Sequence, residues 1–262
     1  MQQVKKISTG LVIGALFTIP FGAKAQTEWQ SRNMLGVQAS VTDKIQLGLS
    51  HMRVFNLSDS FSAAFSFTNI QATYELNKKT DISAGVQLLN NAGSSATRTR
   101  FFIRGAYTTR VLRKLNWTNA LRFELHSKNE TRFRQRAGFS TRLALRKRVT
   151  PLKLIPSVTY AVFYNMGGSP IRYYDKDAQL LARQTPDGLH RSRFTFDLNA
   201  KVNTYLRVSL YYMKQSEFNF LASETRKMNV YDPVRNRTLR PFNNFNAIGL
   251  TAQVNLDPII NR

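Results

Sequence analysis

A strict alternation of arginine with apolar residues is the feature that most constrains the fold of this chain. Between Arg132 and Arg146 the arginines occupy only even positions, whereas Phe133, Phe139 and Leu143 occupy odd ones. Successive side chains of a β-strand point to opposite faces, so such a strand has one cationic and one mostly apolar face. A helix with 3.6 residues per turn would scatter the same arginines around its axis. The alternation therefore predicts a long amphipathic strand.

The same period of two recurs along most of the chain, and short polar breaks divide it into candidate strands. Most of these segments exceed the about 9–11 residues of a tilted membrane-spanning strand. The predicted strands are 31–41, 44–57, 61–76, 80–91, 97–112, 115–128, 132–149, 154–166, 189–203, 204–219 and 243–256.

The connections between these segments alternate between short turns and longer loops. The longest are Met166–Leu189 and Phe220–Phe242, both of which contain proline. Short periplasmic turns and longer extracellular loops are typical of outer-membrane barrels. The sequence predicts an all-β fold, a single antiparallel transmembrane β-barrel of 10–12 strands. Bacterial single-chain barrels have even strand numbers, so we expect ten or twelve: one segment is not a full strand, or residues 221–241 contain a twelfth.

The first 25 residues have the features of a secretory signal peptide. Lys5 and Lys6 precede the apolar stretch Ile7–Phe21, and a small-x-small cleavage site ends at Ala25. Several glycines and a proline disfavour the alternative of a buried N-terminal helix. We expect residues 1–25 to be removed and residues 26–262 to form one barrel domain in the outer membrane.

Composition and compartment together limit the partners. The net charge is +23, and the chain contains no cysteine, which excludes disulfides, thiolate metal sites and a cysteine nucleophile. Such a charge would suggest nucleic-acid binding inside a cell, but an exported protein meets other anions. The expected partners are outer-membrane lipid, lipopolysaccharide phosphates and small anionic solutes. No cofactor or nucleic acid is expected, and we expect a monomer.

Three features resemble an uncharacterised bacterial outer-membrane β-barrel family, known only as a domain of unknown function. They are Trp29, the arginine-alternating segment Arg132–Arg148 and the segment Pro156–Asn165. The resemblance covers most of the chain after the signal peptide. It implies an outer-membrane barrel but no particular activity.

The cost of burying charge predicts which face points inward. An arginine that faces lipid at the bilayer midplane costs about 2–4 kcal/mol, and several of them would exceed the roughly 5–15 kcal/mol that stabilises a domain. The arginines should therefore line the lumen, many of them near the extracellular mouth. There they would attract anions, or alternatively bind lipopolysaccharide phosphates or counter-ions. The predicted cationic set is Arg98, Arg100, Arg104, Arg132, Arg134, Arg136, Arg191 and Arg193.

Hairpin register predicts one ion-pair cluster within this set. A turn centred on Arg113–Leu115 places Arg104 opposite Glu124, and the next hairpin places Glu124 opposite Arg136. We therefore expect a lumenal Arg104–Glu124–Arg136 cluster. It could brace a filled interior, which is the commoner role of such pairs, or select solutes.

No catalytic or metal-binding constellation is predicted. His126 and Ser140 share a face, but the expected register separates them by about six residues, or roughly 20 Å, too far for a nucleophile and its base. His190 is expected at the rim, toward lipid or a loop. Asp175 and Asp177 in the first long loop could bind a divalent cation, but their spacing alone is weak evidence for a metal site. Two alternatives stay open: a lipid-active outer-membrane enzyme, and a soluble periplasmic all-β binding protein whose apolar face points inward.

Overall fold

The computed structural model describes residues 28–111, 114–147, 149 and 154–257. The predicted signal peptide, residues 1–25, lies outside the described residues. No helix in the described part of the chain has the length and apolar character of a helical membrane span.

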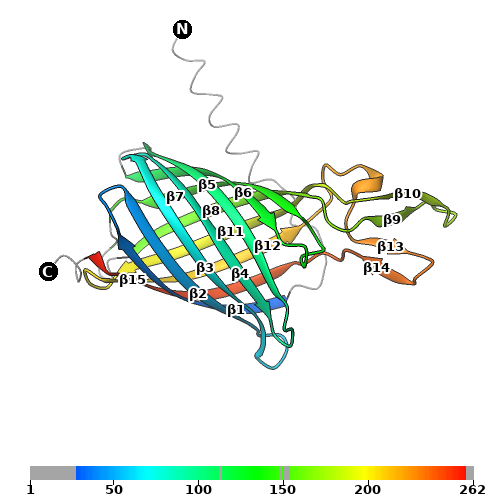
Figure 1. Ribbon diagram of the computed structural model, residues 1–262, viewed down its shortest axis with the longest axis horizontal. Helices are drawn as coiled ribbons and strands as arrows, with labels where there is room; N and C mark the ends of the chain where they lie inside the picture. The colour runs from blue at the N-terminus through cyan, green and yellow to red at the C-terminus, as the bar shows by residue number, and fades with distance from the viewer. Residues whose placement is uncertain (1–27, 112–113, 148, 150–153, 258–262) are drawn as a thin grey trace, which may run out of the picture.

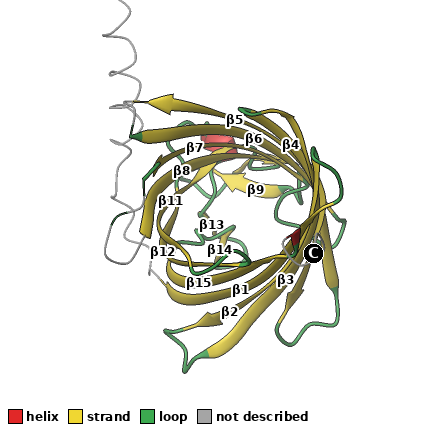
Figure 2. Ribbon diagram, turned by 90° about the vertical axis from the view of Figure 1, so that its left-hand side faces the viewer, coloured by secondary structure: helices red, strands yellow, loops and turns green. Residues whose placement is uncertain are grey.

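Within the described residues, eleven strands close into one barrel (Figures 1 and 2). Ten neighbouring pairs are antiparallel and follow the order of the chain. The all-β transmembrane-barrel prediction is confirmed, and the largest boundary error is at 132–149, where the strand spans only Gln135–Leu145. The barrel strands are β1 (Glu28–Ser40), β2 (Ile45–Asn56), β3 (Ser62–Asn77), β4 (Thr80–Asn91), β5 (Thr97–Val111), β6 (Leu115–His126), β7 (Gln135–Leu145), β8 (Leu154–Met166), β11 (Gly188–Lys201), β12 (Leu206–Glu217) and β15 (Phe245–Asn255).

The strand number lies within the predicted range of ten to twelve, but the expectation of an even number is wrong. In a chain that runs up and down, an odd count makes the first and last strands point the same way. The barrel accordingly closes through a parallel pair, β1 with β15, in the register Glu28↔Phe245 to Gln38↔Asn255. The first predicted segment is a full strand, and residues 221–241 contribute no twelfth barrel strand.

The two longest connections carry small structures of their own at one end of the barrel. β9 (Ile171–Tyr174) pairs with β10 (Leu180–Gln184), and β13 (Val230–Asp232) pairs with β14 (Arg237–Leu239). A short 3-10 helix, η1 (Glu224–Arg226), precedes the second hairpin. The hairpins project beyond the barrel in Figure 1 and lie within its outline when viewed along the axis in Figure 2. They therefore stand over the mouth, where the sequence predicted only loops.

Large apolar side chains cover the outer wall of the barrel. They lie on the strand positions whose neighbours point inward, and this alternation confirms that the apolar face is outside. It contradicts the alternative of a soluble protein with an inward apolar face, because a soluble surface rarely exposes so large an apolar patch. The members on the barrel strands that are more than half exposed are Leu35, Leu49, Ile70, Phe101, Ile103, Leu121 and Leu210.

A charge placed on this wall tests whether it contacts lipid. We expect Leu121→Arg, at a side chain 67% exposed in the middle of β6, to destabilise the barrel in lipid vesicles by about 2–4 kcal/mol. Leu221→Arg is the control, because Leu221 is 70% exposed but lies in the connection after β12. Urea titration of the folded protein in vesicles measures the difference. Equal stability of the two variants would show that the β6 position faces water.

Candidate functional site

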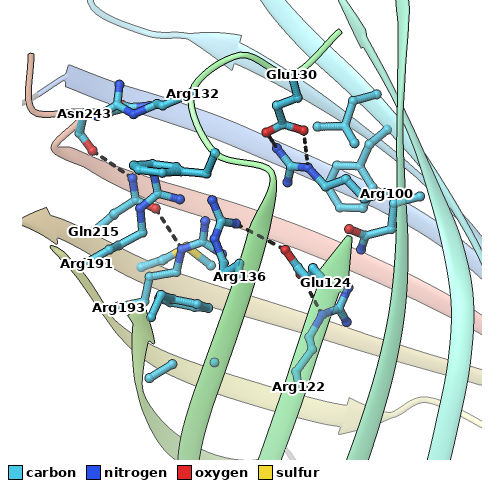
Figure 3. Close-up of a pocket in the computed structure, with 18 of the residues that line it drawn as sticks. Arg100, Arg122, Glu124, Glu130, Arg132, Arg136, Arg191, Arg193, Gln215 and Asn243 are labelled. Atoms are coloured by element: carbon cyan, nitrogen blue, oxygen red, sulfur yellow. Dashed lines mark hydrogen bonds and ion pairs between the residues drawn. The ribbon is translucent and has the colours of Figure 1, made fainter. Parts of the chain in front are cut away.

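The barrel encloses a strongly cationic cavity of about 680 Å³. Nine arginines and two glutamates line it, and no lysine or aspartate among the described residues does so. Figure 3 shows most of these groups close together, contributed by β5, β6, β7, β11 and the loop before β7. The charged lining residues are Arg32, Arg98, Arg100, Arg104, Arg122, Glu124, Glu130, Arg132, Arg136, Arg191 and Arg193.

Seven of the eight predicted cationic residues line this cavity: Arg98, Arg100, Arg104, Arg132, Arg136, Arg191 and Arg193. Arg134 does not, and this prediction is wrong. β7 begins only at Gln135, so residue 134 belongs to the preceding loop. Its exposed side chain lies at the rim beside Gly167, where an added Cβ would be 3.0 Å from the Cβ of Arg134.

The predicted ion-pair cluster forms only in part. β6 and β7 have the predicted register, and Arg136 Nη1 donates to Glu124 Oε2 at 3.4 Å. The predicted register of β5 and β6 is wrong by two residues, because Val111 pairs with Leu115 and the turn is centred earlier. Arg104 therefore lies opposite Arg122 and donates to Asp81 at 2.9 Å. Arg122, and not Arg104, is the second arginine partner of Glu124, and its Nε donates to the carboxylate at 2.7 Å.

Two lumenal arginines are held by neutral groups. Arg32 donates from Nε and Nη2 to the side-chain oxygen of Gln30 at 3.2 and 2.8 Å, and its guanidinium lies 4.2 Å from the ring centre of Phe245. Arg193 donates to Gln215 at 2.8 Å. An amide oxygen orients a guanidinium without cancelling its charge. Neither arginine has a carboxylate partner among the described residues.

These two groups belong to a cluster of like charges contributed by three strands. Arg191 and Arg193 on β11, Arg32 on β1 and Arg136 on β7 line the same cavity, and the guanidinium groups of Arg136 and Arg193 lie 5.7 and 5.2 Å from the centre of one ring, that of Phe163. Arg32 and Arg136 are almost completely buried, so water screens their repulsion poorly. An anion placed among them would gain charge-assisted hydrogen bonds and remove repulsion at once.

A short loop folds across the mouth of this cavity; we call residues 127–134 the mouth segment. Its Phe133 is only 1% exposed. Arg132 reaches across the lumen to Glu217 at 2.6 Å and to the carbonyl of Pro241 at 2.9 Å. Fully buried Glu217 also accepts from Arg191 Nε at 2.9 Å and from the backbone of Asn243 at 2.7 Å. Glu217, at the end of β12, therefore joins the mouth segment, β11 and the segment just before β15.

A second carboxylate fixes the mouth segment to β5. Arg100 Nε donates to Glu130 Oε2 at 2.7 Å. Burial alone would raise the pKa of Glu130, but the hydrogen bonds and charge of Arg100 outweigh it and lower that pKa. Because the folded pKa lies below the unfolded one, this pair stabilises the fold above the ordinary pKa of glutamate, and the stabilisation is lost as the pH falls through the lowered value.

The histidines are engaged in structural contacts. His126 contacts Glu124 Oε2 at 3.1 Å and the carbonyl of Phe133 at 3.0 Å. His190 is fully buried and contacts the carbonyl of Phe218 at 3.1 Å. It lies near the start of β11 and faces the connection after β12, so the loop alternative is confirmed and the lipid alternative is wrong; a register shift between Leu189 and Arg191 breaks the alternation there. No group of three acidic or histidine side chains in the described part could hold a metal.

Sequence reasoning omitted several of these groups. Arg32 follows the alternation of β1 and could have been included in the cationic set. The signal for Glu217 is absent, because its partner Arg132 lies 85 residues away in the chain. Contacts between a loop and a distant strand leave no local pattern.

Comparison with known proteins gives a family and distant structural neighbours. A family model described as "Protein of unknown function (DUF2490)" matches residues 29–226. The NanC porin structure is 10% identical, with a TM-score of 0.45, over 71% of this chain and 84% of NanC. A variant of OccD1 (OprD) is 9% identical, with a TM-score of 0.31, over 72% of this chain and 50% of its own length. No curated protein matches.

Removing the charge of Glu217 tests its role at the mouth. We expect Glu217→Gln to lower the free energy of unfolding by about 3–5 kcal/mol, because it leaves the buried Arg191 and the half-buried Arg132 without their carboxylate. Glu224→Gln is the control, since the Glu224–Lys227 pair is exposed and worth about 1 kcal/mol or less. Urea unfolding followed by tryptophan fluorescence measures both. A loss no larger than that of the control would refute the joining role of Glu217.

Proposed function

This chain belongs to DUF2490, a family of unknown function, and we propose that it is a monomeric outer-membrane barrel whose narrow lumen admits small anions in preference to cations. The observation that carries this proposal is the lining of the cavity, in which nine arginines face two glutamates. A low-dielectric wall with charge of one sign focuses the field and concentrates counter-ions in the channel.

The partners of the arginines support selection as well as bracing. Arg100, Arg122 and Arg136 are ion-paired, so they brace the wall. Arg32 and Arg193 are oriented by glutamines and keep their charge. A lumen built only for mechanical support would be expected to neutralise its charges in pairs. The two neutral-held arginines instead offer free N–H groups to a passing anion.

The apolar wall supports residence in the outer membrane. Transmembrane β-barrels carry an outward apolar band, and single-chain barrels of this kind occur in bacterial outer membranes. Lipopolysaccharide would surround the end that carries the long connections. The exposed Arg134 at that rim is suited to bind its phosphates.

The lumen is suited to small solutes. Eleven strands enclose less space than the 16–18 strands of general porins. The Tyr211 ring occupies part of the interior, where a Cβ added to Gly249 would lie 2.1 Å from it. The mouth segment narrows the path further. We therefore propose passage of small anions and not general diffusion.

The proposed role includes no catalysis. Both ring nitrogens of His126 contact acceptors in the fold, and no observation favours the alternative of a lipid-active enzyme. We expect purified protein to release no fatty acid from phospholipid vesicles and to transfer no acyl chain. Lipid turnover that is lost with His126→Ala would contradict this part of the proposal.

Ion selectivity in planar lipid bilayers tests the proposal. We expect a reversal potential that indicates preference for chloride over potassium in a salt gradient. Arg32→Gln with Arg193→Gln should lower the permeability ratio by about twofold or more, because it removes the neutral-held charges. Arg53→Gln is the control, since Arg53 is exposed on the outward face of β2. Cation preference would refute the proposal, and absence of conductance would favour a purely structural role.

A further inference from the structure

A second cationic cavity lies outside the barrel, between the two hairpins; we call it the hairpin pocket. Its volume is about 480 Å³. Five arginines contribute to its lining, against one carboxylate, that of Asp232. The arginines are Arg172, Arg183, Arg235, Arg237 and Arg240.

Two of these arginines are placed directly against each other. Arg172 on β9 and Arg183 on β10 are cross-strand partners. Like charges opposite each other destabilise an antiparallel pair. Neither has a carboxylate partner within the described residues. An anion bound by both guanidinium groups would turn this repulsion into two charge-assisted contacts.

Asp232 offsets little of this charge, because its carboxylate mainly shapes its own turn. It is fully buried, and its Oδ1 accepts the backbone N–H groups of Val234 and Arg235, both at 3.1 Å. The side chain of Arg235 is 3.9 Å away. Four of the five arginine charges are therefore left without an acidic counterpart in the lining.

Arg240 connects the hairpin pocket to the lumen. Its Nη2 donates to the carbonyls of Thr131 and Ser169 at 2.9 and 3.0 Å, which hold the group in place without neutralising it. Its Nε is buried and has no hydrogen-bond partner. Thr131 lines both the hairpin pocket and the lumenal cavity. The two cavities are therefore adjacent at Thr131.

The pocket is held in shape by contacts between the two hairpins. Ile171, Tyr173 and Leu239 form a small buried core across them. The hydroxyl of Tyr173 donates to the carbonyl of Lys227 at 3.0 Å. A preformed site binds its ligand without paying the cost of ordering its own loops.

We propose that the hairpin pocket is the outer binding site for a soluble multivalent anion, a compound with two or more phosphoryl or carboxylate groups, which the lumen then receives. Passage onward rests on the proposed channel function, but binding at the pocket does not. A lipid headgroup fits less well, because lipids surround the outer wall whereas the hairpins stand over the barrel axis (Figure 2). The spread of five guanidinium groups favours several anionic groups over one.

Calorimetric titration of the detergent-solubilised protein tests this site, with pyrophosphate and citrate as probes and acetate as the monovalent comparison. We expect both probes to bind and acetate to bind at least tenfold more weakly. Arg172→Gln with Arg183→Gln should weaken pyrophosphate binding at least tenfold. Arg226→Gln should leave it unchanged, because Arg226 is an exposed arginine of the same loops that does not line the pocket. The lumenal Arg32→Gln, Arg193→Gln variant should retain it.

Each of the following results would overturn the assignment. The Arg172, Arg183 variant could bind pyrophosphate with wild-type affinity, or Arg226→Gln could weaken pyrophosphate binding equally. Acetate could bind as tightly as pyrophosphate, or the protein could bind lipopolysaccharide micelles and neither soluble probe. Loss of binding only in the lumenal variant would likewise move the site to the barrel interior. Intact pocket binding together with cation-selective conductance would refute the channel proposal and leave the hairpin pocket standing.

Discussion

The stability of the barrel depends on compensating the charge of many guanidinium groups, which are confined in a narrow space with few carboxylates. Removing a charge from water costs several kcal/mol unless partners replace the water. Three glutamates address this at the mouth, where Glu124, Glu130 and Glu217 each contact an arginine and the latter two involve the mouth segment. The structural need to compensate charge thus also fixes the loop that narrows the channel.

The closing seam shows how the odd strand number is accommodated. β1 and β15 run parallel, a pairing slightly less stable per residue than an antiparallel one. Arg32 on β1 lies over the Phe245 ring of β15 and reaches Met213 Sδ on β12 at 3.9 Å. The side chain thus spans the seam and the strand beyond it. Arg32 therefore contributes positive charge to the lumen and also connects the first and last strands of the sheet.

Much of the fold could be predicted from the sequence because alternation with period two is a local property. It identified the strands, the outward apolar face and the β6–β7 register. The β5–β6 register failed because it depends on where a turn is centred, and the polar residues near Leu115 fit two positions. The odd strand number and the contact of Arg132 with Glu217 could not be predicted for a different reason. Both depend on contacts between segments that are distant in the sequence.

On the proposed function, the two cationic cavities would act in series, with the mouth segment between them. Thr131 borders both, and the neighbouring Arg132 is held by Glu217 on the lumenal side. An anion that approaches Arg132 competes with Glu217 for the same guanidinium. An anion would therefore weaken the contact that holds the mouth segment, whereas a cation would not compete with Glu217 for that guanidinium. On the proposed function, such a barrier would open more readily to anions than to cations.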